Sequence, residues 1–338
     1  MSAEIKRKKV LVTGGSGFIG TNLIQSFLDK GMKVLNLDMM PPRNSSHNHV
    51  WHEQDILDKG HVVELVRRFS PDYIFHMAAR TDLNGSKIDE YQANTTGVSN
   101  VIEALNELGK FEKVVFASSM LVCRLGYQPL NDRDYCPPNA YGESKVLGEE
   151  MVRSQMREGL PWVIVRPTSL WGPWFDVPYK KFFTAIQRGL YVHPRGIRVL
   201  RSYGFVMNAV YELERIISSD IDNLPSRILY LADYEPIDFR VWGEMIRSEM
   251  GVRKIKEVPV QVLQVVAKIG DLLAFLGISD PPLSSRRLGN LLTDAVLDLS
   301  DLRQVCQDLP YTVKQGVEMT VKWMCAPGGN ADESGGQH

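Results

Sequence analysis

The segment from Thr13 to Gly20, which reads T-G-G-S-G-F-I-G, constrains the fold of this chain more than any other. It follows a short apolar run at residues 10–12 and opens a helix-like stretch at residues 21–30. Glycines in a turn between a strand and a helix let the backbone approach a pyrophosphate, and the helix N-terminus offers free N–H groups to its charge. The pattern therefore predicts a dinucleotide-binding site.

The carboxylate of Asp38 ends the next apolar run, at residues 34–37. At this place in a dinucleotide fold, a carboxylate can accept hydrogen bonds from the hydroxyls of the adenosine ribose. A free ribose hydroxyl is a feature of NAD and not of NADP. We therefore expect NAD as the cofactor, with NADP less favoured.

Strand-like and helix-like runs alternate through the first half of the chain. Such alternation predicts an α/β fold with a Rossmann-like, doubly wound parallel sheet. The expected strands are residues 10–12, 33–37, 49–51, 73–76, 114–117 and 162–166, and the expected helices include 61–69, 90–108 and 140–158.

The alternation weakens after about residue 170, where prolines punctuate irregular segments. We expect a dinucleotide-binding domain at residues 1–170 and a smaller, mostly substrate-binding lobe at 171–326, from which segments can return to the first domain's core. The Gly-rich, polar tail at 327–338 is expected to be disordered.

The net charge of −1 and the isoelectric point of about 6.7 give no argument for binding nucleic acid or an anionic membrane. The four cysteines form no C-x-x-C pair and no metal-like spacing, so reduced thiols, a cytoplasmic location and no metal site are expected. Residues 258–276 are apolar but contain Lys268 and Asp271, which predicts an amphipathic helix over the substrate side and no membrane span.

Tyr141 and Lys145 stand four residues apart in a helix-like stretch, so their side chains share one face. A nearby ammonium group stabilises a phenolate and lowers the pKa of the tyrosine toward the range useful for proton transfer. Asn139 is a plausible cap for this helix. Ser118 and Ser119 follow the strand at 114–117, where a hydroxyl can bind the substrate oxygen or simply cap a turn.

Together these motifs resemble the extended short-chain dehydrogenase/reductase family, and within it the nucleotide-sugar epimerases, dehydratases and reductases. The resemblance implies that Tyr141 is the general acid/base, that Lys145 holds the nicotinamide ribose, and that Ser119 is the catalytic serine. It implies a homodimer through the helices near 90–108 and 140–158. It also implies cofactor contacts from Gly14, Gly17, Phe18, Ile19, Gly20, Asp38, Asp55, Ile56, Met77, Ala78, Ala79, Asn94, Tyr141, Lys145 and Pro167.

The chain departs from the family pattern at the residues that select the reaction. Met120 and Leu121 stand where the family's dehydratases have an Asp-Glu pair and its decarboxylases keep a glutamate, which argues against both reactions. Leu121 also stands where the C3/C5 epimerases have a cysteine, and Cys123 is expected to be a packed thiol. The reactions that remain possible are epimerisation at C4 with bound NAD and ketone reduction by NADH or NADPH.

The substrate half departs further from the family. Ser169 replaces an asparagine that usually contacts the nucleotide diphosphate, whereas Arg201 matches the phosphate-binding arginine. The expected substrate is a nucleotide sugar, and the expected substrate-binding residues are Arg80, Ser119, Ser169 and Arg201.

Two other functions stay open. The segment Pro281-Pro282-Leu283 and the apolar helix before it resemble the sterol-dehydrogenase and dihydroflavonol-reductase branch, which acts on uncharged hydroxyl or keto substrates. A non-catalytic NAD-binding sensor is the other alternative. The intact Ser119, Tyr141 and Lys145 argue against the sensor, because a sensor needs only the glycine loop.

Overall fold

The computed structural model describes residues 8–176, 179–276 and 283–326. The chain divides into two compact units. The first contains Met1–Leu170, Gly204–Tyr234 and Asp298–Pro310, and the second contains Trp171–Tyr203, Glu235–Leu297 and Tyr311–His338. The tail at 327–338, as well as Pro281 and Pro282, lie outside the described residues.

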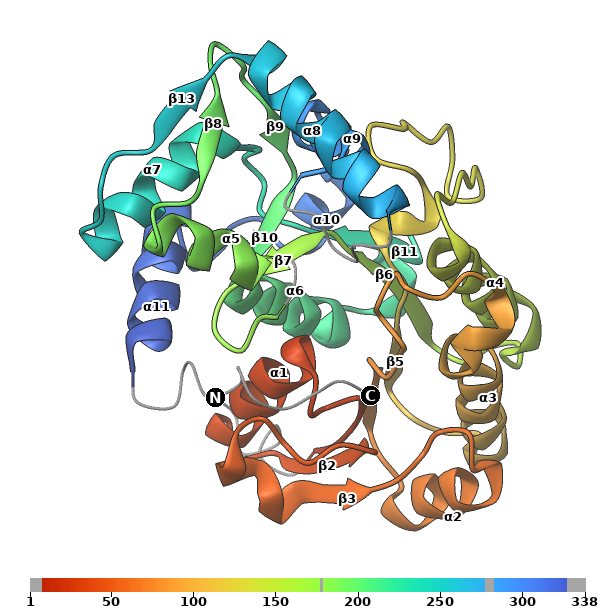
Figure 1. The fold of residues 1–338 in the computed structure, drawn as a ribbon. Helices are drawn as coiled ribbons and strands as arrows, with labels where there is room; N and C mark the ends of the chain where they lie inside the picture. Colours follow the sequence, from red (N-terminus) through yellow and green to blue (C-terminus); the bar gives the residue numbers. More distant parts are fainter. Residues whose placement is uncertain (1–7, 177–178, 277–282, 327–338) are drawn as a thin grey trace. The chain divides into compact units, whose positions relative to one another are not determined.

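The first unit is built on a parallel seven-stranded sheet of order β11-β6-β5-β4-β1-β2-β3 (Figure 1). The order reverses beside β1, as in a doubly wound dinucleotide fold, so the predicted fold class is confirmed. The strands are β1 (Lys9–Thr13), β2 (Lys33–Asp38), β3 (Trp51–Glu53), β4 (Tyr73–His76), β5 (Lys113–Ala117), β6 (Trp162–Pro167) and β11 (Ile228–Leu231).

Alternate side chains of the central strands enter two separate cores, one on each face of the sheet. In β1, Val10 and Val12 belong to one hydrophobic cluster and Leu11 belongs to the other. The first cluster packs under α1 (Phe18–Asp29), α6 (Val206–Ser218) and α10 (Ser300–Val305), and the second under α2 (Lys59–Phe69), α3 (Thr96–Leu108) and α4 (Ala140–Gln155). Burial on both faces explains why these strands read as continuous apolar runs.

Two expectations about local structure are wrong. The strand expected at 49–51 lies at β3, because a 3₁₀ turn, η2 (Ser45–Val50), occupies the preceding residues. The helix expected at 90–108 is broken between the 3₁₀ turn η3 (Ile88–Asn94) and α3, and the fully buried Tyr91 has non-helical φ and ψ of −109° and 43°. Beyond residue 170, α6 and β11 belong to the first unit and add a seventh strand to the sheet.

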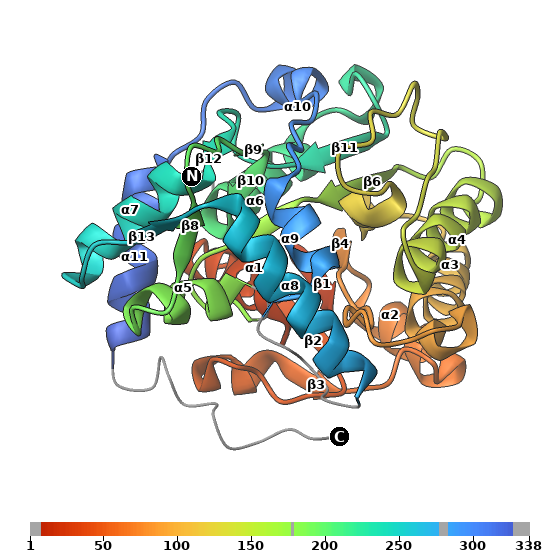
Figure 2. The same cartoon turned by 45° about the horizontal axis from the view of Figure 1, so that its top comes forward.

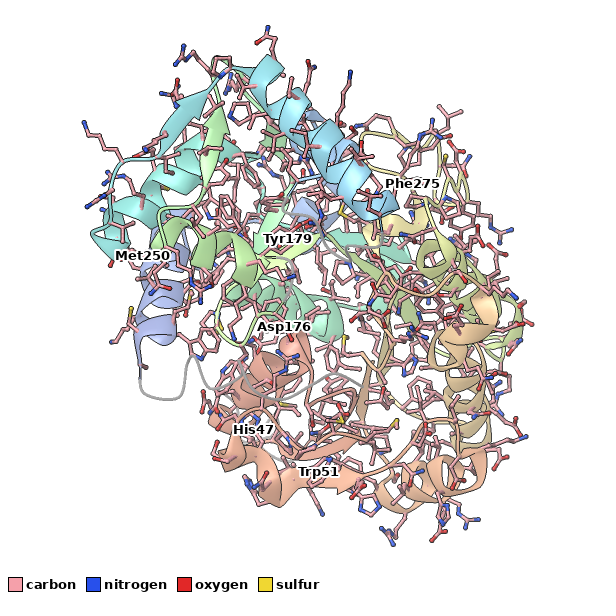
Figure 3. All side chains as sticks on the ribbon, viewed as in Figure 1. His47, Trp51, Asp176, Tyr179, Met250 and Phe275 are labelled. Atoms are coloured by element: carbon pink, nitrogen blue, oxygen red, sulfur yellow. The ribbon has the colours of Figure 1, made fainter. Side chains whose placement is uncertain are left out.

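The second unit has an aromatic core around Trp242, which is fully buried. The ring of Phe182 stacks on it with centroids 5.0 Å apart, and Trp171 lies at 5.2 Å. Tyr179, labelled in Figure 3, begins α5 and packs edge-on to Tyr203 at 5.3 Å. These rings therefore pack against one another and form the core of the second unit.

The remaining elements are short strands and helices, shown from a second direction in Figure 2. They are β7 (Ser169–Trp171), β8 (Val192–Pro194), β9 (Leu200–Arg201), β10 (Tyr203–Phe205), β12 (Ile237–Asp238), β13 (Lys256–Val258), α5 (Tyr179–Gln187), α7 (Phe239–Met250), α8 (Val260–Phe275), α9 (Ser285–Leu292) and α11 (Val313–Cys325), with 3₁₀ turns η4 (Met120–Val122) and η5 (Ile221–Asn223). Among the described residues, no helix is both long enough and apolar enough to cross a bilayer.

A buried ion pair fixes α4 to the sheet. Two nitrogens of Arg166 on β6 donate to the two carboxylate oxygens of Glu149 on α4, each at 2.8 Å, and the two side chains are 2% and 1% exposed. Ser118 and Tyr135 donate to the same carboxylate at 2.6 and 2.8 Å. Such a fully bonded carboxylate is stable when buried, whereas removing it leaves the guanidinium uncompensated.

Replacing Glu149 by leucine is expected to lower the free energy of unfolding by about 3–5 kcal/mol, because Arg166 loses its only carboxylate partner among the described residues. Urea denaturation followed by circular dichroism measures the change. Glu143→Gln, at an exposed position of the same helix, is the matched control and should change stability by less than about 0.5 kcal/mol. A loss below about 1 kcal/mol in Glu149→Leu would show that the pair does not anchor α4.

Candidate active site

The glycine loop between β1 and α1 has no room for side chains at two positions. Gly14 has φ of +72°, and a Cβ there would lie 2.5 Å from the backbone nitrogen of Ala78. A Cβ on Gly20 would lie 2.4 Å from the carbonyl oxygen of Gly14. Gly17 caps α1 without a side-chain hydrogen bond, so the first N–H groups of the helix remain available to an anion.

Asp38 lies beside this loop at the end of β2. Its carboxylate accepts from the backbone N–H of Ser16 at 3.0 Å and from that of Met40 at 2.9 Å. Burial raises its pKa, and these two hydrogen bonds partly offset that effect. The structure therefore places the carboxylate next to the loop that contains Gly14 and Gly17, as the sequence predicts.

The segment that follows β4 runs along the same loop. The backbone N–H of Met77 donates to the carbonyl of Thr13 at 2.9 Å, and that of Ala78 donates to the Thr13 hydroxyl at 3.4 Å. Ala79 comes next in the chain, and Pro167 ends β6, which is separated from β4 by β5. The expected cofactor residues of this group therefore lie at the carboxyl ends of strands of one parallel sheet.

Three other expected cofactor residues have clear structural partners. Asp55 accepts from the backbone N–H of Leu57 at 2.8 Å, and Ile56 packs so closely on Gly97 that a Cβ there would lie 2.5 Å from its side chain. The side-chain amide of Asn94 accepts from the backbone N–H of Arg80 and donates to the Arg80 carbonyl. It also donates to the Ser144 hydroxyl on α4 at 2.9 Å. Asn94 thus positions the helix that carries the catalytic residues.

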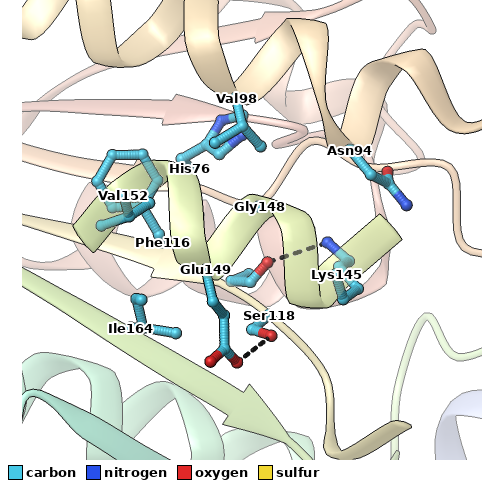
Figure 4. A pocket seen from close by; sticks show the side chains of 11 residues that line it. His76, Asn94, Val98, Phe116, Ser118, Lys145, Gly148, Glu149, Val152 and Ile164 are labelled. Carbon is cyan, nitrogen blue, oxygen red and sulfur yellow. Dashed lines mark hydrogen bonds between the residues drawn. The ribbon is translucent and has the colours of Figure 1, made fainter. Parts of the chain in front are cut away.

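The three expected catalytic residues come together at the carboxyl end of β5. Tyr141 lies in the first turn of α4, which Asn139 caps by accepting from the N–H of Gly142 at 2.9 Å. The Ser119 side chain lies close enough to the phenol to lower the pKa of Tyr141. The Lys145 ammonium donates to the carbonyl of Ala117 at 3.0 Å, as the dashed line in Figure 4 shows.

The close contact between α4 and the turn after β5 depends on a glycine. A Cβ on Gly142 would lie 2.3 Å from the carbonyl oxygen of Leu121. The absence of a side chain there lets the first turn of α4 approach the turn η4, which Ser119 caps by accepting from the N–H of Leu121. This approach brings Tyr141 close to Ser119.

The pKa values of Tyr141 and Lys145 differ from those that the sequence predicts. Burial raises the pKa of Tyr141, and the nearby Ser119 side chain offsets only part of that rise. Burial also lowers the pKa of Lys145 to about 8, because the charged ammonium is withdrawn from water. The lowering of the Tyr141 pKa expected from Lys145 does not appear in this structure, since the ammonium is directed to Ala117.

The two adjacent serines have different partners. Ser118 donates to Glu149 at 2.6 Å (Figure 4), whereas Ser119 accepts from the backbone N–H of Leu121. Its hydroxyl lines a small cavity of about 20 Å³ together with His76, Asn94, Lys145 and Glu149. Ser118 therefore supports the buried ion pair, and Ser119 does not take part in it.

Two polar residues behind the site were not predicted from the sequence. Glu149 stands four residues after Lys145 on α4, a spacing that could have indicated it. His76 has a hydrogen bond to the Thr13 hydroxyl at 2.7 Å, and its complete burial lowers its pKa to about 3, so the imidazole is neutral. His76 thus ties the end of β4 to the glycine loop without adding charge.

The expected substrate residues have different environments. Arg80 is half-exposed, pairs with Asp82 at 2.7 Å and covers the ring of Tyr91. Ser169 is partly buried just after β6. Arg201, in the second unit, is 7% exposed; it donates to the Asn290 carbonyl, and its Nε has no hydrogen-bond partner among the described residues.

Cys123 is buried, its sulfur donates to the Asp134 carbonyl at 3.3 Å, and burial raises its pKa. These contacts favour a protonated, packed thiol. Within the described parts of the chain, no cluster of three or more side chains has the makings of a metal site.

Comparison with known proteins places this chain in one family of NAD-dependent enzymes. The model of the NAD dependent epimerase/dehydratase family matches residues 10–210. The chain is 29% identical over 269 residues to a 3 beta-hydroxysteroid dehydrogenase/Delta 5→4-isomerase of Mycobacterium tuberculosis, covering 72% of this chain and 70% of that protein. It is 27% identical over 347 residues to a UDP-N-acetyl-alpha-D-glucosaminuronate decarboxylase of Bacillus cytotoxicus, covering 94% and 98%.

The fold has close counterparts among solved structures. The UDP-glucose 4-epimerase of Thermotoga maritima, solved with UDP-glucose, superposes with a TM-score of 0.70 at 18% identity, covering 94% of this chain and 98% of that one. The family match spans the glycine loop, Ser119, Tyr141 and Lys145. The chain therefore belongs to the NAD-dependent epimerase/dehydratase family and is an enzyme of the extended short-chain dehydrogenase/reductase type.

Proposed function

We propose that the protein is an NAD-dependent nucleotide-sugar 4-epimerase or keto-sugar reductase, which moves a hydride to or from a carbon that bears a hydroxyl or keto group. The observation that carries the reaction type is the proximity of Ser119 and Tyr141 at the carboxyl end of β5, with Lys145 one helical turn away. Met120 and Leu121 supply no further acid or base for elimination.

The residues present fit a dinucleotide. The positive end of α1 is uncapped by a side chain, and glycines at 14 and 20 leave space that a Cβ would fill. When bound, the nicotinamide supplies the hydride acceptor or donor. The loop binds and orients the cofactor by its backbone, in the way that helix N-termini hold pyrophosphates.

The proton transfer belongs to Tyr141 and Ser119. The Ser119 hydroxyl orients the substrate oxygen, and the Tyr141 phenol gives its proton to that oxygen in reduction or takes one in oxidation. Because burial raises the Tyr141 pKa, the phenol form is favoured in the free enzyme, and a positive charge nearby is needed to stabilise the phenolate. Lys145, with a pKa of about 8, is the resident group that can provide it.

The choice of NAD over NADP is proposed from Asp38. Its carboxylate lies at the end of β2, where it can accept from ribose hydroxyls and repel a phosphate in their place. From this position Asp38 selects the cofactor and also stabilises the glycine loop by accepting from the backbone N–H of Ser16.

An anionic substrate is favoured by Arg201. The residue is 7% exposed, and its guanidinium is bonded to one backbone carbonyl; within the described ranges its Nε has no hydrogen-bond partner and no carboxylate pairs with it. A diphosphate is a suitable partner for an arginine fork. This observation supports a nucleotide sugar as the substrate.

A second candidate is the oxidation or reduction of an uncharged hydroxy or keto compound. The 29% identity to the mycobacterial steroid dehydrogenase favours it, as does the serine at position 169 in place of a diphosphate-binding asparagine. Both candidates use the same proton transfer from Tyr141. They differ in whether Arg201 binds substrate.

Tyr141→Phe is expected to lower kcat by at least about 100-fold, because the proton at the substrate oxygen is lost. NAD affinity should stay within about twofold, since the phenol is not needed to hold the pyrophosphate. Isothermal titration measures the NAD affinity. Turnover of a panel of nucleotide sugars and hydroxysteroids is measured by NADH absorbance for net oxidation or reduction and by chromatographic separation of the sugar epimers for epimerisation. Tyr127→Phe, which removes a hydroxyl bonded to Asp134, is the matched control; retained activity in Tyr141→Phe would refute the assignment.

Asp38→Ala is expected to weaken NAD binding by about tenfold or more, because a charged acceptor of ribose hydrogen bonds is removed. NADP affinity should stay unchanged or rise, since the repulsion of its phosphate is relieved. Fluorescence titration with NADH and NADPH compares the two. Asp29→Ala, at the end of α1, serves as the control. An equal loss for both cofactors would contradict a ribose contact and indicate collapse of the loop.

Arg201→Met is expected to abolish binding of UDP, used as a probe of the diphosphate site, while leaving NAD affinity unchanged. Arg198→Met removes an exposed arginine of the same unit that pairs with Asp238, and should retain UDP binding. Isothermal titration provides the measurement. If wild-type protein binds no UDP yet turns over a hydroxysteroid, the second candidate replaces the first.

A further inference from the structure

The ring of Tyr91 packs against the ring of Tyr141. The two ring centroids lie 6.0 Å apart, with an angle of 58° between the ring planes. Both rings belong to a small buried cluster that also contains Ala140, and the partly buried Leu121 packs against it. Tilted aromatic pairs at this separation attract each other beyond the effect of burial. Tyr141 therefore has a buried aromatic neighbour in addition to Ser119.

The hydroxyl of Tyr91 is bonded within the loop that precedes η3. It donates to the carbonyl of Asp82 at 2.9 Å and accepts from the backbone N–H of Gly85 at 3.2 Å. A Cβ on Gly85 would lie 2.6 Å from the Tyr91 ring, so the loop passes directly against the ring. Because Tyr91 is fully buried and both of these bonds are made to backbone groups, its side chain is fixed to the loop at 82–85.

Arg80 covers the ring of Tyr91, with its guanidinium carbon 5.0 Å from the ring centroid. Two of its nitrogens donate to the carboxylate of Asp82 at 2.7 and 3.2 Å, and a third donates to the carbonyl of Glu90 at 2.8 Å. The backbone of Arg80 is in turn bonded to the side chain of Asn94. A cation held in this way over an aromatic face adds a further constraint on the ring.

The contacts of Tyr141 leave its ring dependent on Tyr91. The Lys145 ammonium is directed to the carbonyl of Ala117, and Ser119 lies near the phenol oxygen. Burial raises the pKa of Tyr141, and the Tyr91 phenol adds to that rise. An acid/base group works only when its oxygen is within hydrogen-bonding reach of the substrate oxygen, and an error of about 1 Å in its place can cost about 100-fold in rate.

We propose that Tyr91 is a positioning residue for the proton transfer, which holds the Tyr141 ring in place and links it to the loop at 80–90. This inference rests on the proposed function, in which Tyr141 exchanges a proton with the substrate oxygen. Arg80 then acts on the reaction through Tyr91, by fixing the ring that supports the phenol. The conformation of the loop thereby sets the place of the phenol oxygen.

Fluorine NMR of the full-length protein labelled with 3-fluorotyrosine observes Tyr141 without any turnover, and the resonance that Tyr141→Phe removes identifies it. Tyr91→Leu is expected to shift this resonance and to raise the acid dissociation constant of Tyr141 by about threefold or more, because water reaches a phenol that the ring had shielded. Tyr91→Phe keeps the ring and should change that constant by less than about twofold.

Steady-state kinetics then separate positioning from binding. Tyr91→Leu is expected to lower kcat by about tenfold or more while KM stays within about twofold, since the phenol is displaced and no substrate contact is removed. Gly85→Ala pushes a Cβ into the Tyr91 ring and should lower kcat by about fivefold in the wild-type background. In the Tyr91→Leu background the same change should have less than about a twofold effect, because the ring it displaces is gone.

The matched control is Phe27→Leu, which removes a buried ring that packs on Phe75 at 5.3 Å in the other core of the sheet. It should keep kcat within about twofold of wild type, although it loses a similar amount of packing. The thermal midpoint verifies that each variant is folded. An unchanged Tyr141 resonance and dissociation constant in Tyr91→Leu would overturn the positioning role, as would equal losses of kcat in Tyr91→Leu and Phe27→Leu. Retained activity in Tyr141→Phe would instead refute the proposed function, which the NMR measurement does not require.

Discussion

The active site depends on the buried ion pair between Glu149 and Arg166. Lys145 and Glu149 occupy successive turns of α4, and Tyr141 begins the same helix. Because the carboxylate is fixed by two bonds of 2.8 Å to a central strand, the helix cannot rotate without breaking them. The position of the phenol beside Ser119 follows from this anchor and from the missing side chain at Gly142.

The glycine loop supplies the second constraint. Gly14 and Gly20 bring three backbone segments together, and Asp38 and His76 tie the ends of β2 and β4 to the same place. The anchor on α4 and this loop meet at the carboxyl ends of the parallel strands, where doubly wound sheets bind ligands. The geometry of the candidate active site thus arises from backbone contacts and one ion pair.

Features encoded by local periodicity could be predicted from the sequence. The alternating runs up to residue 166 and the spacing of Tyr141 and Lys145 predict the sheet and the catalytic helix, because burial and helical repeat act over a few residues. Long-range features could not be located from the sequence. It allows segments that return to the first domain's core but does not say which one joins the sheet, because β11 pairs with β6 across more than sixty residues. The different partners of Ser118 and Ser119 depend on where α4 lies.

The central claim is that this chain moves a hydride, with Tyr141 handling only the proton on oxygen. The most direct measurement follows deuterium placed on the carbinol carbon of a substrate that the enzyme turns over. Mass spectrometry in ordinary water then reports where the label goes. The account predicts that the label is found on the nicotinamide or is retained on the product carbon. Loss of the label to water would show proton abstraction from carbon and contradict the account.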